Sequence, residues 1–512
     1  MVPVVQYMSE ATDASKQAVS AGRGVAYIAG AKLYFMVAGF AIETLLPRLF
    51  GKALFGAYAF VAGAVSNLNN VFVTGTIQAV SRYTTVDPER ADHVKAAGLR
   101  MHLVVGVPVV ILYAALAPLW AHLAHDPGKT GLLALSAAIV AGYAFYSVLV
   151  GSANGTRAFH KQARLDITFA TLRAGGILAA AYLGLGVYGA IGGWAAAVAL
   201  VLVVAAVWVG LPRGAKADPI GPMARFFGRL APYLILLNLI LSVDQYLLKR
   251  LSTEWYQAHP GLVASVSKAS DVQVAFYRAA QNLARLPYQL MLAVTFVIFP
   301  LISRSTFEAD HDRTRAYIRT TLRYSLIFAA FMGTTLAANP GPMVDVLYAP
   351  EFAAAGGPAM AALALGSVAF IVFTIAGTVL NGAGHTRDAT LVAGVTLALL
   401  TGALFVVVPR FAPGRDMLLA CGVTTGSAMA LGALLSGWFL VKRFGTFVPV
   451  LTVVRVGLAV AGVLALGRVI PARRPLQTLA TAAAYGAVYL VILVVTGELG
   501  PKDLLAIRRR GT

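Results

Sequence analysis

Stretches of about 20 apolar residues recur along the whole chain and are separated by short polar segments. A helix needs about 20 such residues to cross a hydrocarbon core roughly 30 Å thick, where only helices and closed barrels satisfy every backbone polar group. The pattern therefore predicts an all-α polytopic membrane protein with 14 transmembrane helices. The predicted spans are residues 24–46, 53–76, 99–119, 130–152, 165–186, 188–211, 230–251, 272–300, 320–338, 357–381, 389–409, 416–441, 453–470 and 477–497.

Three landmarks in the sequence occur twice at nearly the same interval. They are Ser81-Arg82 and Ser303-Arg304 after the second and eighth spans, 222 residues apart, Asn154-Gly155 and Asn381-Gly382 ending the fourth and tenth spans, 227 apart, and Tyr58 and Tyr277 entering the second and eighth spans, 219 apart. A unit of six spans returns the chain to its starting side, so the two copies must be parallel.

The repeat predicts two six-helix lobes around a central cavity, with two further helices at the C-terminal end. Two facing lobes are the geometry of alternating access, with a substrate site near mid-membrane. The predicted organisation is a cytoplasmic segment (1–22), an N-lobe with spans one to six (23–211), a cytoplasmic linker (212–229), a C-lobe with spans seven to twelve (230–441), spans thirteen and fourteen (442–497) and a basic cytoplasmic tail (498–512).

Composition and charge agree with a membrane protein. Hydrophobic residues make up 59% of the chain, charged residues 12%, and the mean hydropathy is +0.76, which lies outside the range of soluble globular chains. With a cytoplasmic N-terminus, that side of the membrane collects 25 Lys and Arg residues and the other side 11, so the positive-inside rule places both termini in the cytoplasm. Most of the net charge of +20 then faces anionic lipid headgroups and does not indicate a nucleic-acid ligand.

Polar side chains follow one face of several predicted spans at helical spacing. The stripes are Arg278, Asn282, Arg285 and Gln289 in the eighth span, Asn238, Ser242, Gln245 and Lys249 in the seventh, Asn67, Asn70, Thr74 and Gln78 in the second, and Lys32 with Glu43 in the first. The simplest arrangement turns these stripes toward one wet cavity. For the amides and hydroxyls, an equally good interpretation is that they hydrogen-bond neighbouring helices together.

The arginines in the eighth span support the cavity interpretation, because placing a charged side chain at the bilayer centre costs at least about 2.5–3.5 kcal/mol. Pro287 lies just beyond Arg285 and predicts a helix kink there. A cavity with more cations than anions suits an anionic ligand, since guanidinium binds phosphate oxygens in a bidentate manner and lysine adds a point charge. Arg173 and Arg48 either extend this positive path or snorkel to an interface.

Two carboxylates have open roles. Asp244, in the apolar seventh span, is either the counter-ion of a buried arginine or a titratable or cation-binding coupling group. Glu43 carries the same ambiguity near the outer interface. Glu43 shares a helix face with Lys32 but lies about 16 Å away, too far for a salt bridge.

Enzyme chemistry finds little support in the sequence. His122, His125 and Asp126 lack further ligands at the spacing of a metal site, and the chain has no Walker-type glycine loop, Gly-x-Ser-x-Gly elbow or His-Glu-x-x-His motif. The single cysteine, Cys421, can form no intrachain disulfide. We therefore expect no catalytic residue, no metal and no cofactor.

Six stretches carry a resemblance to a known family through their order and spacing. They are LLPRLFGKALFGAYAF (45–60), SRYTTVDPER after the second span, GSANGTRAFHKQARLD at the end of the fourth, SVDQYLLKRL in the seventh, FYRAAQNLARLPYQLMLAVTFVIFPLISRS (276–305) and VDVLYAPEFAAAGGP (344–358). With these, the chain resembles the multidrug/oligosaccharidyl-lipid/polysaccharide (MOP) exporter superfamily, and within it the Wzx-type polysaccharide flippases and their lipid II flippase relatives.

The resemblance implies a flippase that moves undecaprenyl-diphosphate-linked oligosaccharide from the cytoplasmic to the periplasmic leaflet, coupled to H+ or Na+. Arg278 and Lys32 would meet the diphosphate with Arg285 behind them, and Asp244 matches an acid used for cation coupling. It also implies a monomer in the bacterial cytoplasmic (inner) membrane, with polysaccharide polymerase machinery as partner. One departure is the segment 253–271, which is longer and more polar than the family's short turn.

Two alternatives belong to the same superfamily. A lipid II flippase would carry a peptidoglycan precursor on the same diphosphate lipid. A cation-coupled multidrug exporter would favour acids and aromatics in its cavity, usually with twelve spans, so fourteen spans and an arginine-bearing helix argue against it.

Overall fold

The computed structural model describes residues 2–214, 216–470, 472 and 475–500. These residues form helices joined by turns, with no β-strand among them, which confirms the predicted all-α class. The predicted basic tail beyond residue 500 lies outside the described residues. Three 3-10 helices (Pro88–Arg90, Pro127–Lys129 and Val408–Arg410) and one π-helix (His102–Gly106) join or interrupt the α-helices.

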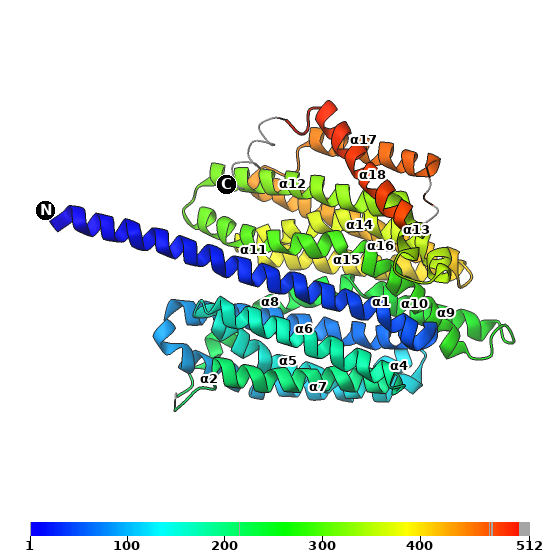
Figure 1. The fold of residues 1–512 in the computed structure, drawn as a ribbon, viewed down its shortest axis with the longest axis horizontal. Helices are drawn as coiled ribbons and strands as arrows, with labels where there is room; N and C mark the ends of the chain where they lie inside the picture. Colours follow the sequence, from blue (N-terminus) through cyan, green and yellow to red (C-terminus); the bar gives the residue numbers. More distant parts are fainter. Residues whose placement is uncertain (1, 215, 471, 473–474, 501–512) are drawn as a thin grey trace. The chain divides into compact units, whose positions relative to one another are not determined.

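The α-helices, labelled in Figure 1, are α1 (Val2–Val86), α2 (Ala91–Met101), α3 (Val107–Ala115), α4 (Ala117–Leu123), α5 (Thr130–Gly155), α6 (Phe159–Tyr182), α7 (Gly186–Val209), α8 (Ile220–Ile240), α9 (Val243–Ala258), α10 (Val266–Ala284), α11 (Leu286–Phe307), α12 (His311–Ala338), α13 (Pro340–Asp345), α14 (Pro350–Gly382), α15 (Thr386–Val407), α16 (Arg415–Phe444), α17 (Val450–Val469) and α18 (Pro475–Val495).

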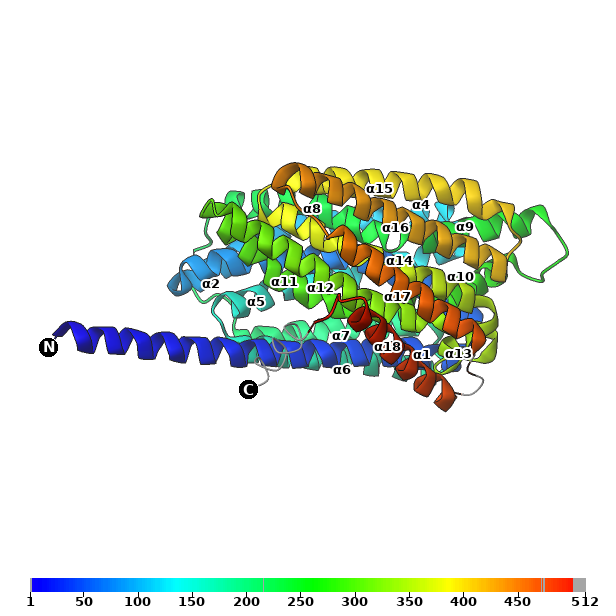
Figure 2. The same ribbon diagram turned by 90° about the horizontal axis from the view of Figure 1, so that it is seen from above.

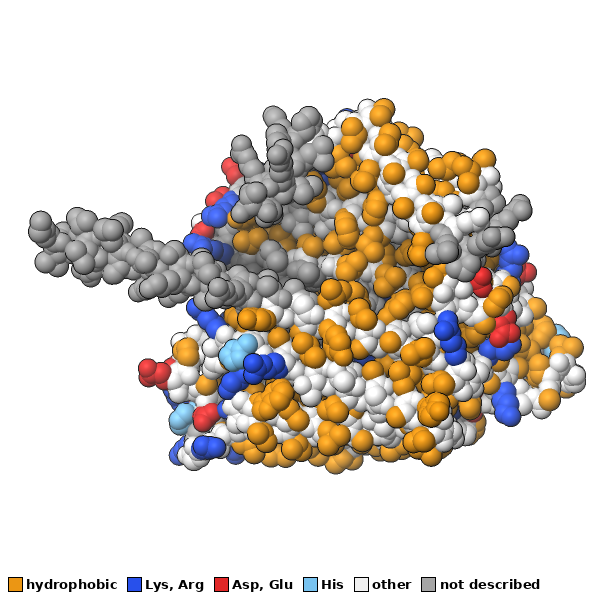
Figure 3. Space-filling model, in the orientation of Figure 1, with side chains coloured by type: hydrophobic (Ala, Val, Ile, Leu, Met, Phe, Trp, Pro, Cys, Tyr) orange, Lys and Arg blue, Asp and Glu red, His pale blue; other side chains and the backbone are white. Residues whose placement is uncertain are grey.

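Ten helical segments in the described part of the chain are long and apolar enough to cross a membrane. The first two predicted spans share α1, in which Gly51 interrupts the helical backbone with a φ of 72°. On the face drawn in Figure 3, hydrophobic side chains cover the middle of the helices, and charged side chains gather toward their ends. A membrane protein is confirmed, and the count of fourteen spans stays a prediction.

The chain divides into two compact units. Unit 1 runs to Leu54 and resumes over Val61–Ile235, and unit 2 comprises Phe55–Phe60 and the chain from Leu236 onward. Unit 1 therefore holds most of α1 and the helices up to the first part of α8. The predicted cavity between two lobes depends on how such units face each other and stays a prediction.

The short segment Phe55–Phe60 of α1 packs with unit 2 because its residues allow a very close approach. A Cβ atom on Gly56 would lie 1.8 Å from the backbone oxygen of Asp271 in α10, so only glycine fits there. The side chain of Gln245 in α9 donates a hydrogen bond to the backbone oxygen of Ala59 at 2.8 Å. This stretch of α1 is thus held by a close approach to the backbone of α10 and by a side-chain hydrogen bond from α9.

Two helices end with the same local geometry 227 residues apart. The backbone N–H of Arg157 donates to Asn154 O at 2.9 Å after α5, and that of Gly384 donates to Asn381 O at 3.1 Å after α14. Arg157 and Gly384 both have positive φ, 58° and 84°, as in helix ends that close with a left-handed residue. The repeat seen in the sequence is therefore also a repeat of local structure.

Unit 2 is built around α14, which packs against α16, α12, α10 and α11. A Cβ on Gly366 of α14 would lie 2.5 Å from the Cα of Gly426 in α16, so two glycines bring these helices together. The last two helices, α17 and α18, pack on α12 (Figure 2), where Tyr485 and Tyr489 are buried in a shared apolar cluster.

A buried carboxylate three residues after α18 ties this end of the chain to α12 and α17. Glu498 is 3% exposed and accepts hydrogen bonds from Arg323 Nε at 2.7 Å, Thr452 Oγ1 at 2.8 Å and Arg455 Nη1 at 3.2 Å. Burial raises the pKa of the Glu498 carboxyl, but these hydrogen bonds outweigh burial and leave the pKa below its ordinary value of 4.5. A carboxyl whose pKa is lowered by folding stabilises the folded state while it is charged.

We expect Glu498→Gln to lower the stability of the detergent-solubilised protein at neutral pH, by about 1–3 kcal/mol, because charged hydrogen bonds are lost. The wild-type advantage should be fully present above the ordinary pKa of 4.5 and should shrink as the pH falls through the lowered pKa of the folded state. Thermal unfolding at several pH values measures this. As a control, Glu254→Gln removes a carboxylate from a more exposed pair with Arg250 and should change little. Equal melting of Glu498→Gln and wild type at neutral pH would contradict the prediction.

Candidate functional site

Two helices in unit 2 are broken, and the breaks follow from local sequence. The predicted seventh span is divided between α8 and α9, which leaves Leu241 and Ser242 outside both helices, and the eighth between α10 and α11, which leaves Arg285 between them. Pro287 is the second residue of α11. Because proline has no backbone N–H and clashes with the preceding turn, this break confirms the kink predicted beside Arg285.

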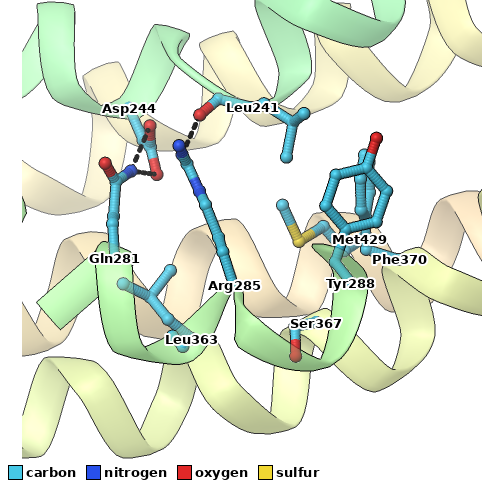
Figure 4. Close-up of a pocket in the computed structure, with 10 residues that line it drawn as sticks. Leu241, Asp244, Gln281, Arg285, Tyr288, Leu363, Ser367, Phe370 and Met429 are labelled. Atoms are coloured by element: carbon cyan, nitrogen blue, oxygen red, sulfur yellow. Dashed lines mark hydrogen bonds between the residues drawn. The ribbon is translucent and has the colours of Figure 1, made fainter. Parts of the chain in front are cut away.

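The two breaks meet through one hydrogen bond. The Nη2 atom of Arg285 donates to the backbone oxygen of Leu241 (Figure 4). This carbonyl stands at the C-terminal end of α8, where carbonyls without helical partners carry the negative end of the helix dipole. A guanidinium has five N–H donors, and this is the one hydrogen bond that the Arg285 guanidinium makes to a described residue.

Asp244, in the first turn of α9, lies beside this contact and is 1% exposed. Tyr277 donates to its Oδ2 at 2.7 Å, and the amide of Gln281 donates to both carboxylate oxygens at 3.0 and 2.9 Å. The backbone N–H of Gln245 adds a bond at 2.8 Å, and Thr425 adds one at 3.3 Å. Neutral donors therefore occupy both oxygens of this carboxylate.

A pocket lies against these groups, with about 320 Å³ of space between atoms, a volume that includes open solvent. Its walls are Leu241, Asp244, Gln281, Ala284, Arg285, Tyr288, Leu363, Ser367, Phe370 and Met429. Most of this wall is apolar, so an ionic contact within it is screened less than one in water. Since the acceptors of Asp244 are already occupied, the main polar group that the cavity offers to a ligand is the Arg285 guanidinium. Such a donor suits an oxyanion.

The other residues predicted on the eighth span have different surroundings. Arg278 is half-buried, Gln289 is exposed, and Asn282 is buried and donates to the hydroxyl of Tyr348 at 3.3 Å. Of the four residues predicted to share a face, Arg285 is the one in the cavity wall. The roles assigned to Arg278, Asn282 and Gln289 stay predictions.

The polar stripe of the seventh span is buried inside unit 2. Asn238, Ser242 and Gln245 are at most 8% exposed, and Ser242 Oγ donates to the backbone oxygen of Asn238 at 2.8 Å. Lys249 forms an ion pair with Asp271 at 2.8 Å. These bonds hold neighbouring segments together, as the helix-packing interpretation of such residues describes.

In unit 1, the predicted cations of the first and fifth spans gather around one aromatic ring. The ammonium of Lys32 lies 5.9 Å from the ring centre of Phe35, and the guanidinium carbon of Arg173 lies 6.0 Å from it. Arg173 also stacks on Trp194 at 4.4 Å. Lys32 forms an ion pair with Asp166 at 2.8 Å. The structure thus brings Lys32 and Arg173 together in unit 1.

The remaining predicted residues of unit 1 differ in exposure. Glu43 is buried and Arg48 is exposed. In the stripe of the second span, exposure is intermediate for three residues and high for the fourth: Asn67, Thr74 and Gln78 are half-buried and Asn70 is exposed. None of these four residues is fully buried, and their assignment to a cavity stays a prediction.

Sequence reasoning missed four residues of these two clusters: Tyr277, Gln281, Thr425 and Asp166. Tyr277 and Gln281 are four residues apart, and each directly precedes one of the predicted residues Arg278 and Asn282. Their spacing marks a second polar stripe on the same helix, and this pattern could have identified them from the sequence. Asp166 stands in the polar stretch KQARLD at the start of the fifth span, which is typical of an interface.

Two family models match the sequence. One, described as "Polysaccharide biosynthesis protein", matches residues 21–306, and one named MatE matches residues 250–407. No curated protein sequence is similar enough to match the chain.

Solved structures share the fold at low sequence identity. The lipid II flippase MurJ in an inward closed conformation is 14% identical, with 91% of this chain and 98% of that chain covered and a TM-score of 0.69. A MOP superfamily transporter from Pyrococcus furiosus is 16% identical over 82% and 95%, with a TM-score of 0.60. A multidrug resistance MATE family transporter in an inward-facing conformation is 17% identical over 81% and 94%, with a TM-score of 0.59.

Proposed function

Since this chain belongs to the polysaccharide biosynthesis protein family and is a membrane transporter of the MOP superfamily rather than an enzyme, we propose that it flips a lipid-linked oligosaccharide. The substrate is an oligosaccharide on undecaprenyl diphosphate, moved from the cytoplasmic to the periplasmic leaflet of the bacterial inner membrane by alternating access. The purpose is the synthesis of a surface polysaccharide such as O-antigen or exopolysaccharide.

The observation that carries this proposal is the Arg285 guanidinium in the cavity wall. The guanidinium uses one N–H on the Leu241 carbonyl, and the fork of remaining donors matches the oxygens of a phosphate. The break between α10 and α11 keeps the guanidinium at the wall of an apolar cavity. A diphosphate carries the oxyanions that such a site binds.

A second group of cations supports an anionic substrate. Lys32 and Arg173 in unit 1 flank Phe35, and Asp166 balances one of the two charges. The cluster therefore has a net positive charge. We assign Lys32 to the diphosphate and Arg173 to the path that leads to it.

A multidrug exporter of the same superfamily would bind cationic drugs, and the MatE family model matches part of the chain. The cavity disfavours this alternative. Its one carboxylate, Asp244, already accepts hydrogen bonds from Tyr277 and Gln281, and the neighbouring Arg285 repels a cation. A lipid II flippase shares the diphosphate chemistry, so only the group attached to the diphosphate separates it from the proposed function.

The test uses purified protein in proteoliposomes that contain one of three labelled compounds: undecaprenyl-diphosphate-linked oligosaccharide, lipid II or the cationic dye ethidium. We expect the oligosaccharide lipid to reach the opposite leaflet and ethidium to remain where it was added. Faster flipping of lipid II than of the oligosaccharide lipid would reassign the substrate. Transport of ethidium without either lipid would overturn the proposal.

A further inference from the structure

The carboxylate of Asp166 in α6 has one cationic partner. Its side chain is 8% exposed, and Lys32 Nζ lies 2.8 Å from its Oδ2. No other described residue donates a hydrogen bond to this oxygen. In contrast to Asp244, which neutral donors surround, Asp166 thus depends on a single lysine among the side chains that the structure describes.

The two partners differ greatly in exposure. The Lys32 side chain is 55% exposed while that of Asp166 is 8% exposed. Lys32 is therefore accessible to solvent, while the carboxylate with which it pairs is buried. An ion pair with one exposed partner is weak, because solvent screens it and the long lysine side chain loses freedom when it is held.

We propose that Asp166 is a positioning residue that occupies Lys32 in the substrate-free protein and is displaced from it by the diphosphate of the substrate. The proposal rests on the proposed function, because it takes an anionic lipid as the ligand of Lys32. A diphosphate carries more negative charge than one carboxylate and can also attract Arg173, which shares Phe35 with Lys32. Asp166 thus holds the ammonium in place and lowers the affinity for the substrate, which favours release.

This role predicts a gain of affinity on substitution. Asp166→Asn should tighten binding of farnesyl diphosphate, a soluble probe that carries the same headgroup chemistry, by about two- to fivefold, the size expected for removing one exposed ion-pair competitor. Isothermal titration calorimetry in detergent measures it. A carboxylate needed only for the fold would give weaker binding or none.

The gain must depend on Lys32. In the Lys32→Ala background, Asp166→Asn should leave the probe affinity unchanged, because the competition no longer exists. Asp218→Asn is a matched control: it removes one negative charge from unit 1, at an ion pair with Arg90, and should change the affinity little.

Asp166→Ser removes the same charge with a smaller side chain and serves as a second neutral variant. A folded neutral variant with unchanged or weaker binding would overturn the proposal, as would unfolding of both, which would make the carboxylate a requirement of the fold. If Lys32→Ala alone binds the probe as wild type does, Lys32 is not its ligand, and both this proposal and the assignment of Lys32 fail. A loss with Lys32→Ala but no gain with Asp166→Asn refutes only the role of Asp166.

Discussion

Replacing Arg285 by alanine is expected to abolish flipping of a diphosphate-linked lipid, whereas lysine at this position should rescue it only in part. Lysine restores the charge but lacks the planar fork that binds two phosphate oxygens at once. A charge-assisted contact contributes about 1.5–3 kcal/mol, so one substitution should weaken substrate binding about tenfold to a hundredfold. We expect the same loss for Arg278→Ala. Flipping in proteoliposomes and binding of the lipid in detergent are the two measurements.

Thermal unfolding separates this role from a structural one. Arg285 also donates to the Leu241 carbonyl, so its alanine variant should melt slightly earlier, while the lysine variant can keep that bond. Arg250→Ala is the control, because Arg250 contacts Glu254 and Phe405 and does not line the cavity. Alanine variants that flip normally but insert poorly or melt much earlier would show that these arginines are structural, and the argument for a cationic site would be wrong.

Replacing Asp244 by asparagine is expected to leave the fold intact and to remove the dependence of flipping on an ion gradient. The change removes a titratable charge at nearly constant volume. The local hydrogen bonds can adapt, because the Oε1 atom of Gln281 is buried and has no partner among the described residues. Rotation of that amide would let Oε1 accept from the new carboxamide.

The measurement compares flipping with and without a proton or sodium gradient, and the ratio of the two rates should approach unity in the Asp244→Asn variant. Asp388→Asn, which removes a carboxylate paired with Arg443, should keep the wild-type ratio. Gradient stimulation of normal size in the Asp244→Asn variant would make this carboxylate a counter-ion of Arg285. The neutral donors around Asp244 would then serve only to solvate it.

The fold class follows from the sequence alone for a simple reason. In a bilayer, every backbone polar group must be bonded within its own helix or barrel, so long apolar runs specify helices without knowledge of their neighbours. Helix breaks and helix ends that depend on neighbouring residues can also be predicted from the sequence. Pro287 predicts the break beside Arg285, and the paired Asn154 and Asn381 predict two equivalent helix ends, because these effects act within a turn or two of the residue.

Side-chain contacts between different helices could not be predicted, because helical spacing shows which face of its helix a residue occupies but not which helix packs against that face. The spacing excluded a Lys32–Glu43 pair, and only the packing of α1 on α6 pairs Lys32 with Asp166. In the eighth span, Arg278 and Asn282 share a stripe with Arg285. Packing of α10 against α9 and α14 nevertheless places Tyr277 and Gln281 on Asp244. The break in the seventh span was equally hidden, because neither Leu241 nor Ser242 is a helix breaker. Only the structure shows that the Leu241 carbonyl accepts a hydrogen bond from Arg285, which lies between α10 and α11.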